Sequence, residues 1–156
     1  MDFPTLISGG QTGADRAALD WAIANGIAHG GWCPCGRLAE DSEIDTRYHL
    51  RETPEADYLQ RTEWNVKDSD ATLIISLAAQ LTGGSLATME LAAAHNKPCL
   101  HLSGLQNASD NAPQLAGFLR KNKVEVLNVA GPRASGAPEV AAFIQEIFNE
   151  LLANWE

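Results

Sequence analysis

A short apolar run, a glycine-rich turn and a helical pattern follow one another at the start of the chain. Leu6 and Ile7 are apolar, the next six residues read S-G-G-Q-T-G, and apolar side chains then recur at helical spacing from Ala14 to Asn25. Glycines let a backbone approach a ligand closely, and the N–H groups at a helix N-terminus favour anions. This segment therefore predicts a βα unit whose turn either binds phosphate or is simply tight.

The first turn matches neither of two common phosphate-binding motifs. Its third glycine, Gly13, falls one position too early for the dinucleotide-binding pattern G-x-G-x-x-G, and no lysine follows it as in a P-loop. Three glycines together with Ser8, Thr12 and Asp15 nevertheless provide more polar groups than a bare turn needs. We therefore favour binding of an anion or a nucleotide at this turn.

The alternation of strand, turn and helix recurs along the chain. Residues 71–77 are apolar without alternation, which is typical of a parallel strand covered on both faces. The other expected elements are a weak strand within 27–32, strands at 99–102 and 124–129, and helices at 13–24, 54–67, 85–95, 113–121 and 138–153. This order predicts an α/β fold in a single domain of residues 1–156, a Rossmann-like open, mostly parallel sheet with helices on both faces.

The sequence also indicates where two of the helices begin and which long segment is irregular. Thr53 is a good N-cap and Pro54 suits the first position of the helix at 54–67, while Pro113 suits the start of the helix at 113–121. Residues 33–53 contain many charged residues and are expected to be irregular. A segment of this length in a compact domain is functional or mobile, and whether it closes over a ligand stays open.

Three turns are expected to share one site. The carboxyl ends of parallel strands lie at one edge of a sheet, so T-G-G-S at 82–85 and A-G-P-R-A-S-G at 130–136 should lie beside the first turn. Arginine clamps phosphate by paired hydrogen bonds. The candidates for this role are Arg16, Arg51, Arg61 and Arg133, of which Arg133 lies in a glycine turn.

Two aspartates could accept hydrogen bonds from ribose hydroxyls or pterin N–H groups. They are Asp15 and Asp70, although Asp70 also suits a plain helix-to-strand turn. The full predicted ligand-binding set is Gly9, Gly10, Gln11, Thr12, Gly13, Asp15, Arg16, Asp70, Gly83, Gly84, Ser85, Thr88, Gly131, Arg133 and Ser135.

Composition restricts the partners. The chain has 156 residues and a net charge of −9, so neither nucleic acid nor an anionic membrane surface is an expected partner. No stretch is apolar enough to span a bilayer, the N-terminus lacks signal-peptide features, and an odd number of cysteines fits a reducing cytoplasm. Cys33, Cys35 and His29 fall short of a structural zinc site, so no metal site is expected.

Several motifs together resemble a known family. They are S-G-G-Q-T-G-A-D-R-A-A-L-D-W-A-I, G-G-W-C-P, G-R-L-A-E-D, L-R-E-T-P, Y-L-Q-R-T-E-W-N-V-K-D-S-D-A-T-L-I, the turn at 83–85, K-P-C-L-H-L and N-V-A-G-P-R. From residue 6 to about residue 135 the chain resembles the molybdenum cofactor carrier proteins of the circularly permuted YpsA group, within the LOG-like Rossmann superfamily. The resemblance implies a homo-oligomer that holds the molybdenum cofactor, or another pterin phosphate or nucleotide, at its glycine turns.

Two departures from related patterns bear on function. Cys35 stands where family members commonly have lysine. The phosphoribohydrolase branch of the superfamily carries P-G-G-x-G-T-x-x-E, whereas this chain has T-G-G-S-L-A-T-M-E and retains the glutamate as Glu90. Three hypotheses therefore stand: a carrier of a phosphorylated pterin or nucleotide, an N-glycosidic hydrolase of a nucleoside monophosphate with Glu90 as its catalytic group, and a nucleotide sensor.

Overall fold

The computed structural model describes residues 1–156, apart from the side chain of Ala108. Within these residues one sheet has the strand order β2–β1–β7–β5–β6, and all neighbouring strands are parallel. Its strands are β1 (Thr5–Ile7), β2 (His29–Gly30), β5 (Ala71–Ser76), β6 (Cys99–Ser103) and β7 (Val126–Ala130). The predicted open parallel sheet is confirmed, and its strands end at a common edge.

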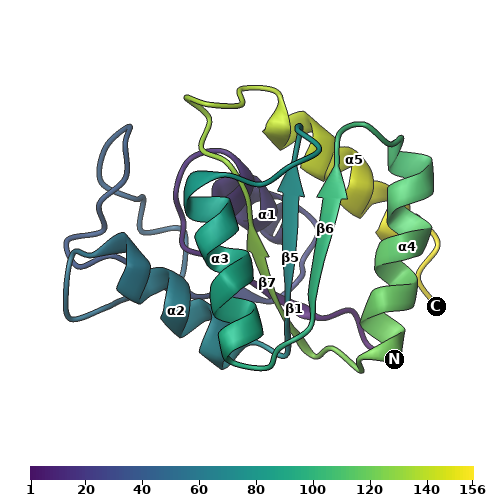
Figure 1. Ribbon diagram of the computed structural model, residues 1–156, viewed down its shortest axis with the longest axis horizontal. Coiled ribbons are helices and arrows are strands. Elements are labelled where there is room, and N and C mark those ends of the chain that lie inside the picture. The colour runs from purple at the N-terminus through teal and green to yellow at the C-terminus, as the bar shows by residue number, and fades with distance from the viewer.

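Helices cover both faces of the sheet (Figure 1). α1, α4 and α5 pack on one face, and α2 and α3 pack on the other, where α3 crosses in front of the strands in this view. The helices are α1 (Ala14–Ala24), α2 (Tyr58–Asp68), α3 (Gly83–Ala94), α4 (Ala108–Lys121) and α5 (Val140–Ala153). This arrangement is the predicted α/β architecture.

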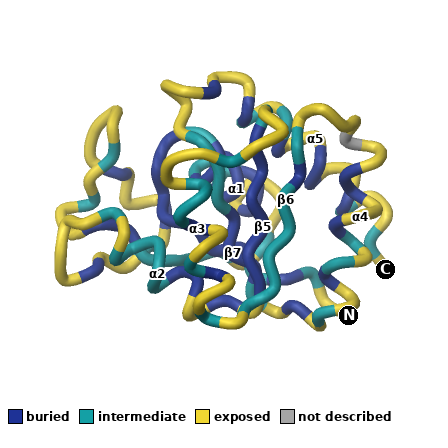
Figure 2. Tube along the Cα trace, viewed as in Figure 1, coloured by how far each residue is buried: buried dark blue, intermediate teal, exposed yellow. Residues whose placement is uncertain are grey.

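The main apolar core lies between the sheet and α1, α4 and α5. β5 is fully buried, as its continuous apolar sequence predicts, and Leu73 and Ile75 point into this core. Trp21 of α1 stacks on Phe148 of α5 with 5.1 Å between ring centroids. Each fully buried large apolar side chain contributes about 1.5–3 kcal/mol, so the central strands and this helix layer hold the fold together (Figure 2).

The segment after α1 folds against the main sheet as a separate small layer. Its β3 (Trp32–Cys33) and β4 (Arg51–Glu52) pair in parallel, and the residues between them are largely irregular, as expected. Ile44 and Tyr48 are buried against Leu19 of α1 in a second apolar cluster. This cluster anchors residues 33–53 beside the first glycine turn.

The predicted start of α2 was wrong. The helix begins at Tyr58, and the side chain of Asp57 caps it by accepting a hydrogen bond from the Leu59 N–H at 2.9 Å. The Thr53 hydroxyl instead donates to the carbonyls of Cys33 and Glu55, so it belongs to the β3–β4 layer. A tertiary hydrogen bond thus overrides the local N-cap signal.

α4 begins five residues earlier than Pro113, at Ala108. Asn111 is fully buried and its side-chain amide donates to the carbonyls of Ser103 and Gln106, both at 3.4 Å. These bonds fix the first turn of the helix to the end of β6. Pro113 is therefore tolerated inside the helix, where it removes one backbone hydrogen bond near an exposed end.

Candidate functional site

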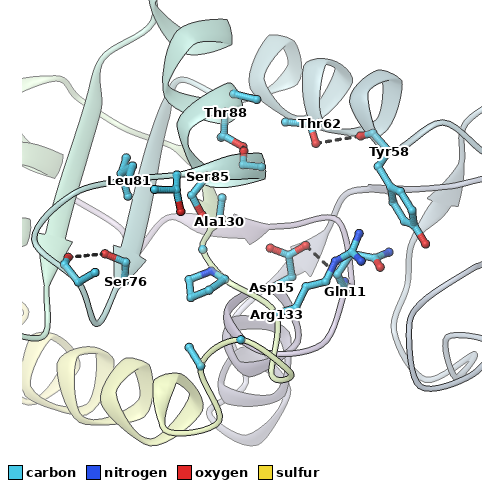
Figure 3. Close-up of a pocket in the computed structure, with 18 of the residues that line it drawn as sticks. Gln11, Asp15, Tyr58, Thr62, Ser76, Leu81, Ser85, Thr88, Ala130 and Arg133 are labelled. Atoms are coloured by element: carbon cyan, nitrogen blue, oxygen red, sulfur yellow. Dashed lines mark hydrogen bonds between the residues drawn. The ribbon is translucent and has the colours of Figure 1, made fainter.

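A cavity of about 690 Å³ lies at the carboxyl ends of β1, β5 and β7 (Figure 3). Its walls come from α2, the N-terminal half of α3, and residues 130–137, and its floor includes Gln11 and Asp15 of the first turn. The volume lies within the range of about 300–1,000 Å³ that is usual for small-molecule sites. All three predicted turns contribute to this one cavity.

A buried ion pair forms part of the floor. Arg61 of α2 places Nη1 3.4 Å from Asp15 Oδ2, and the Gln11 N–H donates to the same oxygen at 3.3 Å. Burial raises the pKa of Asp15 because it disfavours the carboxylate, although Arg61 opposes this shift. Burial likewise lowers the pKa of Arg61, although Asp15 opposes it. Each of the two groups therefore favours the charged form of the other in this buried position.

Two polar atoms of the floor have no hydrogen-bond partner in the described part of the chain. Gln11 Nε2 donates to the Leu38 carbonyl at 2.8 Å, but Gln11 Oε1 is buried and unpaired. Arg61 Nε is also buried and unpaired. An unpaired buried polar group costs about 1–3 kcal/mol, so a ligand that pairs with these two atoms would recover that cost. Arg16 Nε and Asn111 Oδ1 are also buried and unpaired, but they lie outside the cavity lining.

Tyr58 and Arg133 stand above this floor. The Arg133 guanidinium lies 4.6 Å from the centre of the Tyr58 ring, and the Arg61 guanidinium lies 5.7 Å from the same centre. Tyr58 is half-buried, whereas Arg133 is exposed. The aromatic ring and the exposed guanidinium together offer a surface on which a planar ligand can stack.

The first glycine turn is closed by other parts of the protein. A Cβ at Gly9 would collide with Arg61, and one at Gly10 would lie 2.5 Å from Leu50. Gly13 has φ 82°, and a Cβ there would lie 2.7 Å from the Ala134 N–H nitrogen. These three predicted ligand-binding glycines pack against other parts of the protein, Gly9 and Gly10 against side chains and Gly13 against backbone, so this turn offers no open cradle for phosphate.

Three further predicted residues hold the segment 33–53 in place. The Thr12 hydroxyl donates to the Glu40 carboxylate, and the Ser135 hydroxyl donates to Glu40 Oε2 at 2.7 Å. Arg16 pairs with Asp41 and donates to the Gly10 carbonyl at 3.1 Å. Thr12, Ser135 and Arg16 are thus engaged within the protein.

Glu40 joins the segment 33–53 to the turn that carries Arg133. Hydrogen bonds from Thr12 and Ser135 hold the pKa of Glu40 below its ordinary value, because they favour the carboxylate. The Ser135 N–H also donates to this carboxylate at 3.2 Å. We call Glu40 with Thr12 and Ser135 the Glu40 clasp.

The second glycine turn is open. Thr82, Gly83 and Gly84 are exposed, and no atom of the described chain lies within 4 Å of a Cβ built at either glycine. The Thr82 side chain does not cap α3, so the first N–H groups of this helix have no side-chain partner at the N-cap. Gly84, Ser85 and Thr88 line the cavity. The N-terminus of α3 therefore lies at the cavity with no acidic residue in its own first turn.

Of the two remaining predicted ligand-binding residues, Gly131 lies at the cavity and Asp70 lies far from it. Gly131 lines the cavity, where it packs closely against Ile75 and Ala14. Asp70 precedes β5 and so lies at the opposite edge of the sheet, where its Oδ2 accepts the N–H groups of Glu125 and Val126, both at 2.9 Å. Asp70 is thus a turn residue and does not reach the cavity.

Glu90 and Arg51 also lie outside the residues that line the cavity. Glu90 is exposed on α3, two positions after Thr88, and a step of two residues turns a helix by about 200° to its other side. Arg51 rests on the ring of Trp32, with its guanidinium carbon 4.1 Å from the ring centre.

The prediction missed most of the contribution of α2. Tyr58 and Thr62 line the cavity with Arg61, and Asn65 lies below them, where its amide bonds to the backbone of Trp32. These four residues occupy positions i, i+3, i+4 and i+7, which is one face of a helix. A polar stripe where a helix should bury apolar residues was the signal that could have identified this wall.

Comparisons with known proteins agree with the fold. A sequence model of the circularly permutated YpsA SLOG family matches residues 6–152. The chain belongs to this family. Among solved structures, a putative molybdenum carrier protein from Syntrophus aciditrophicus SB is 46% identical, with a TM-score of 0.94 over 96% of this chain and 95% of that one. A search of curated proteins found no match.

Clusters of metal-ligating side chains and membrane-spanning helices are both absent from the described residues. No group of three or more His, Cys, Asp or Glu side chains in this part of the chain is arranged to hold a metal ion. None of the described helices has the length and apolar character needed to cross a membrane.

Proposed function

We propose that this protein binds and carries a phosphorylated pterin or nucleotide-like molecule in the 690 Å³ cavity, with the molybdenum cofactor as the leading candidate. The carrier role is supported by the name of the 46% identical protein and by the membership of this chain in the circularly permutated YpsA SLOG family. The observation that carries the proposal is the cavity itself, with an open helix N-terminus at one end and a buried polar floor at the other.

The phosphate is assigned to the N-terminus of α3. Backbone N–H groups there face the cavity, glycine at 83 and 84 leaves room for close approach, and the helix dipole favours negative charge. The floor suits phosphate less well, because the Asp15 carboxylate and Gln11 Oε1 are acceptors there and the Arg61 guanidinium is already paired with Asp15. The two ends therefore prefer opposite parts of the ligand.

The ring system is assigned to the other end. Tyr58 provides an aromatic face, Arg133 can cover the opposite face, and Asp15 accepts hydrogen bonds from ring N–H groups. Carriage is favoured over hydrolysis because Glu90, the glutamate of the hydrolase motif, is exposed and lies outside the cavity lining. The protein would hold its ligand by these contacts and release it unchanged.

Thermal unfolding with isolated molybdenum cofactor tests this function. A ligand that binds the folded state stabilises it by about 2.7 kcal/mol at one hundred times its Kd. We expect the cofactor to raise Tm, and molybdate or tungstate alone to leave Tm unchanged. No stabilisation by the cofactor or by phosphorylated nucleosides would contradict the proposal.

A matched pair of variants tests the place of the phosphate. In Gly84→Asp the new carboxylate occupies the helix N-terminus, where it suits the dipole but repels phosphate, whereas Gly84→Asn has nearly the same size without the charge. We expect Gly84→Asp to fold at least as stably as the parent and to lose the ligand-induced rise in Tm. Equal ligand responses in both variants would place the phosphate elsewhere.

A further inference from the structure

We propose that the floor of the cavity selects a ring with a 2-amino-4-oxo edge, as in pterins and guanine, over an adenine-type ring. This inference rests on the proposed function and adds the chemical class of the ring. It is argued from three groups of the floor: the Asp15 carboxylate, Gln11 Oε1 and Arg61 Nε.

Asp15 has one oxygen available to a ligand. The hydrogen bonds that it accepts from the Gln11 N–H and from Arg61 Nη1 both end on Oδ2. In Figure 3 its other oxygen points into the cavity, toward the side of Ser85 and Ala130. This oxygen has no hydrogen-bond partner in the described chain, so it can accept a hydrogen bond from an N–H group of a ligand.

Gln11 offers a second acceptor. Its amide orientation is set by the Leu38 carbonyl, which accepts from Nε2 at 2.8 Å, because a flipped amide would place two oxygens against each other. Oε1 is therefore the atom left buried and unpaired in the described chain. The floor thus presents two acceptors, the free oxygen of Asp15 and Gln11 Oε1.

Arg61 supplies one donor. Its Nη1 is directed to Asp15, while Nε is buried and has no acceptor among the described residues. A ligand that satisfies all three groups presents two donors and one acceptor. An exocyclic amino group, a ring N–H and a carbonyl along one edge provide that set, whereas adenine offers its amino group beside an unprotonated ring nitrogen.

Access to the floor requires a side chain to move. Arg133 is exposed, rests on Tyr58, and makes no hydrogen bond or ion pair with the described residues. Its charge also repels Arg61 and contributes to the lowered pKa of that guanidinium, after burial as the main cause. A ligand ring that takes over the Tyr58 face would displace Arg133 outward and expose Gln11 Oε1 and Arg61 Nε.

Calorimetric titration with three mononucleotides tests the selection. GMP has the full edge, IMP lacks the amino group, and AMP has the reversed pattern, while all three carry the same ribose phosphate. A lost hydrogen bond to a buried group weakens binding by about tenfold. We expect IMP to bind about tenfold more weakly than GMP, and AMP about one hundredfold more weakly.

Variants of the floor separate this inference from the proposed function. Gln11→Met removes Oε1, and Arg61→Lys keeps the charge beside Asp15 but removes Nε. Each should reduce the affinity for GMP and for isolated molybdenum cofactor about tenfold, while AMP binding stays nearly constant. Equal binding of the three nucleotides, or unchanged cofactor affinity in both folded variants, would overturn the inference and leave the carrier function standing. Binding of neither nucleotide nor cofactor would overturn both.

Discussion

Two glycine-rich turns lie at the same edge of the sheet and have opposite surroundings. In the first turn, Gly9 to Gly13 are covered by Arg61, by Leu50 of the segment 33–53, and by residues 132–134. In the second turn, Gly83 and Gly84 have no atom of the described chain within 4 Å of a built Cβ. At the first turn the missing side chains let other parts of the protein pack against the glycines, whereas at the second turn they leave room for a ligand.

The difference determines which end of the cavity suits which chemical group. The closed turn brings the Asp15 carboxylate and the side-chain oxygen Oε1 of Gln11 to the cavity floor, so that end attracts hydrogen-bond donors. The open turn leaves the N–H groups of α3 facing the cavity, so that end attracts an anion. The comparison predicts that equivalent substitutions at the two turns have unlike effects.

The largest effect is expected from Gly13→Ala. Gly13 has φ 82° and ψ −126°, and its Cβ would collide with the backbone of residues 132–134. Backbone strain and overpacking together should lower the free energy of unfolding by about 4 kcal/mol, as measured by urea denaturation. Gly26→Ala is the control, because Gly26 also has positive φ but has open space around it, and it should cost only about 1 kcal/mol. Equal costs would mean that close packing does not explain the first turn.

The second effect concerns the ion pair that closes the first turn. Arg61→Met leaves the Asp15 carboxylate buried without its partner and should destabilise the fold by about 3 kcal/mol at neutral pH. Adding Asp15→Asn removes the stranded charge, so the double variant should recover much of this loss in a double-mutant cycle. Additive effects would show that the pair is not coupled.

The pH dependence of Arg61→Met follows from the raised pKa of Asp15. A group with a raised pKa in the folded state favours folding most at low pH and loses that contribution as pH rises through the folded pKa. Removing Arg61 raises that pKa further. The destabilisation should therefore shrink as the pH falls and Asp15 becomes neutral, and a constant deficit across pH would contradict this account.

The sequence predicted the parallel sheet because each βα unit carries its own local pattern. The apolar run in β5, for example, has the sequence of a strand buried on both faces. Closure of the first turn could not be predicted in this way, because Arg61 and Leu50 come from segments distant in the chain. Local pattern identifies a glycine turn, whereas long-range packing decides whether that turn stays open.

Two errors at the candidate site had a visible physical cause. Asp70 stands before its strand, so a parallel sheet places it at the edge opposite the cavity. Glu90 follows the cavity-lining Thr88 by two residues, which turns it to another side of α3. Strand direction and helix phase would have excluded both. The pairing of Glu40 with Ser135, by contrast, gave no signal in the sequence.

A small stabilisation is expected at the open turn. Gly84→Ala adds a methyl group that meets no atom and replaces glycine inside a helix, so stability should rise by about 0.5 kcal/mol. Gly83→Ala is the control, because Gly83 has φ 55° and should lose stability instead. Urea denaturation measures the free energy of unfolding of both variants. A destabilised Gly84→Ala would show that the second turn lacks the open space that distinguishes it from the first turn.

The smallest effect on global stability is expected for Glu40→Gln, which weakens the Glu40 clasp. Glu40 is exposed, so the change should appear as faster amide hydrogen exchange in residues 33–53 and at Ser135, with Tm nearly unchanged. Exposed Glu43, which lies outside the clasp, provides the control Glu43→Gln.

Hydrogen bonds from Thr12 and Ser135 lower the pKa of Glu40 from its ordinary value of 4.5, so its contribution is complete above that pH and is lost as pH falls through the lowered pKa. Protection in the parent should therefore decline in acid toward that of Glu40→Gln. If both variants exchange alike at neutral pH, the closed state of the first turn depends on the apolar contacts of Leu50 and Ile44 rather than on the clasp.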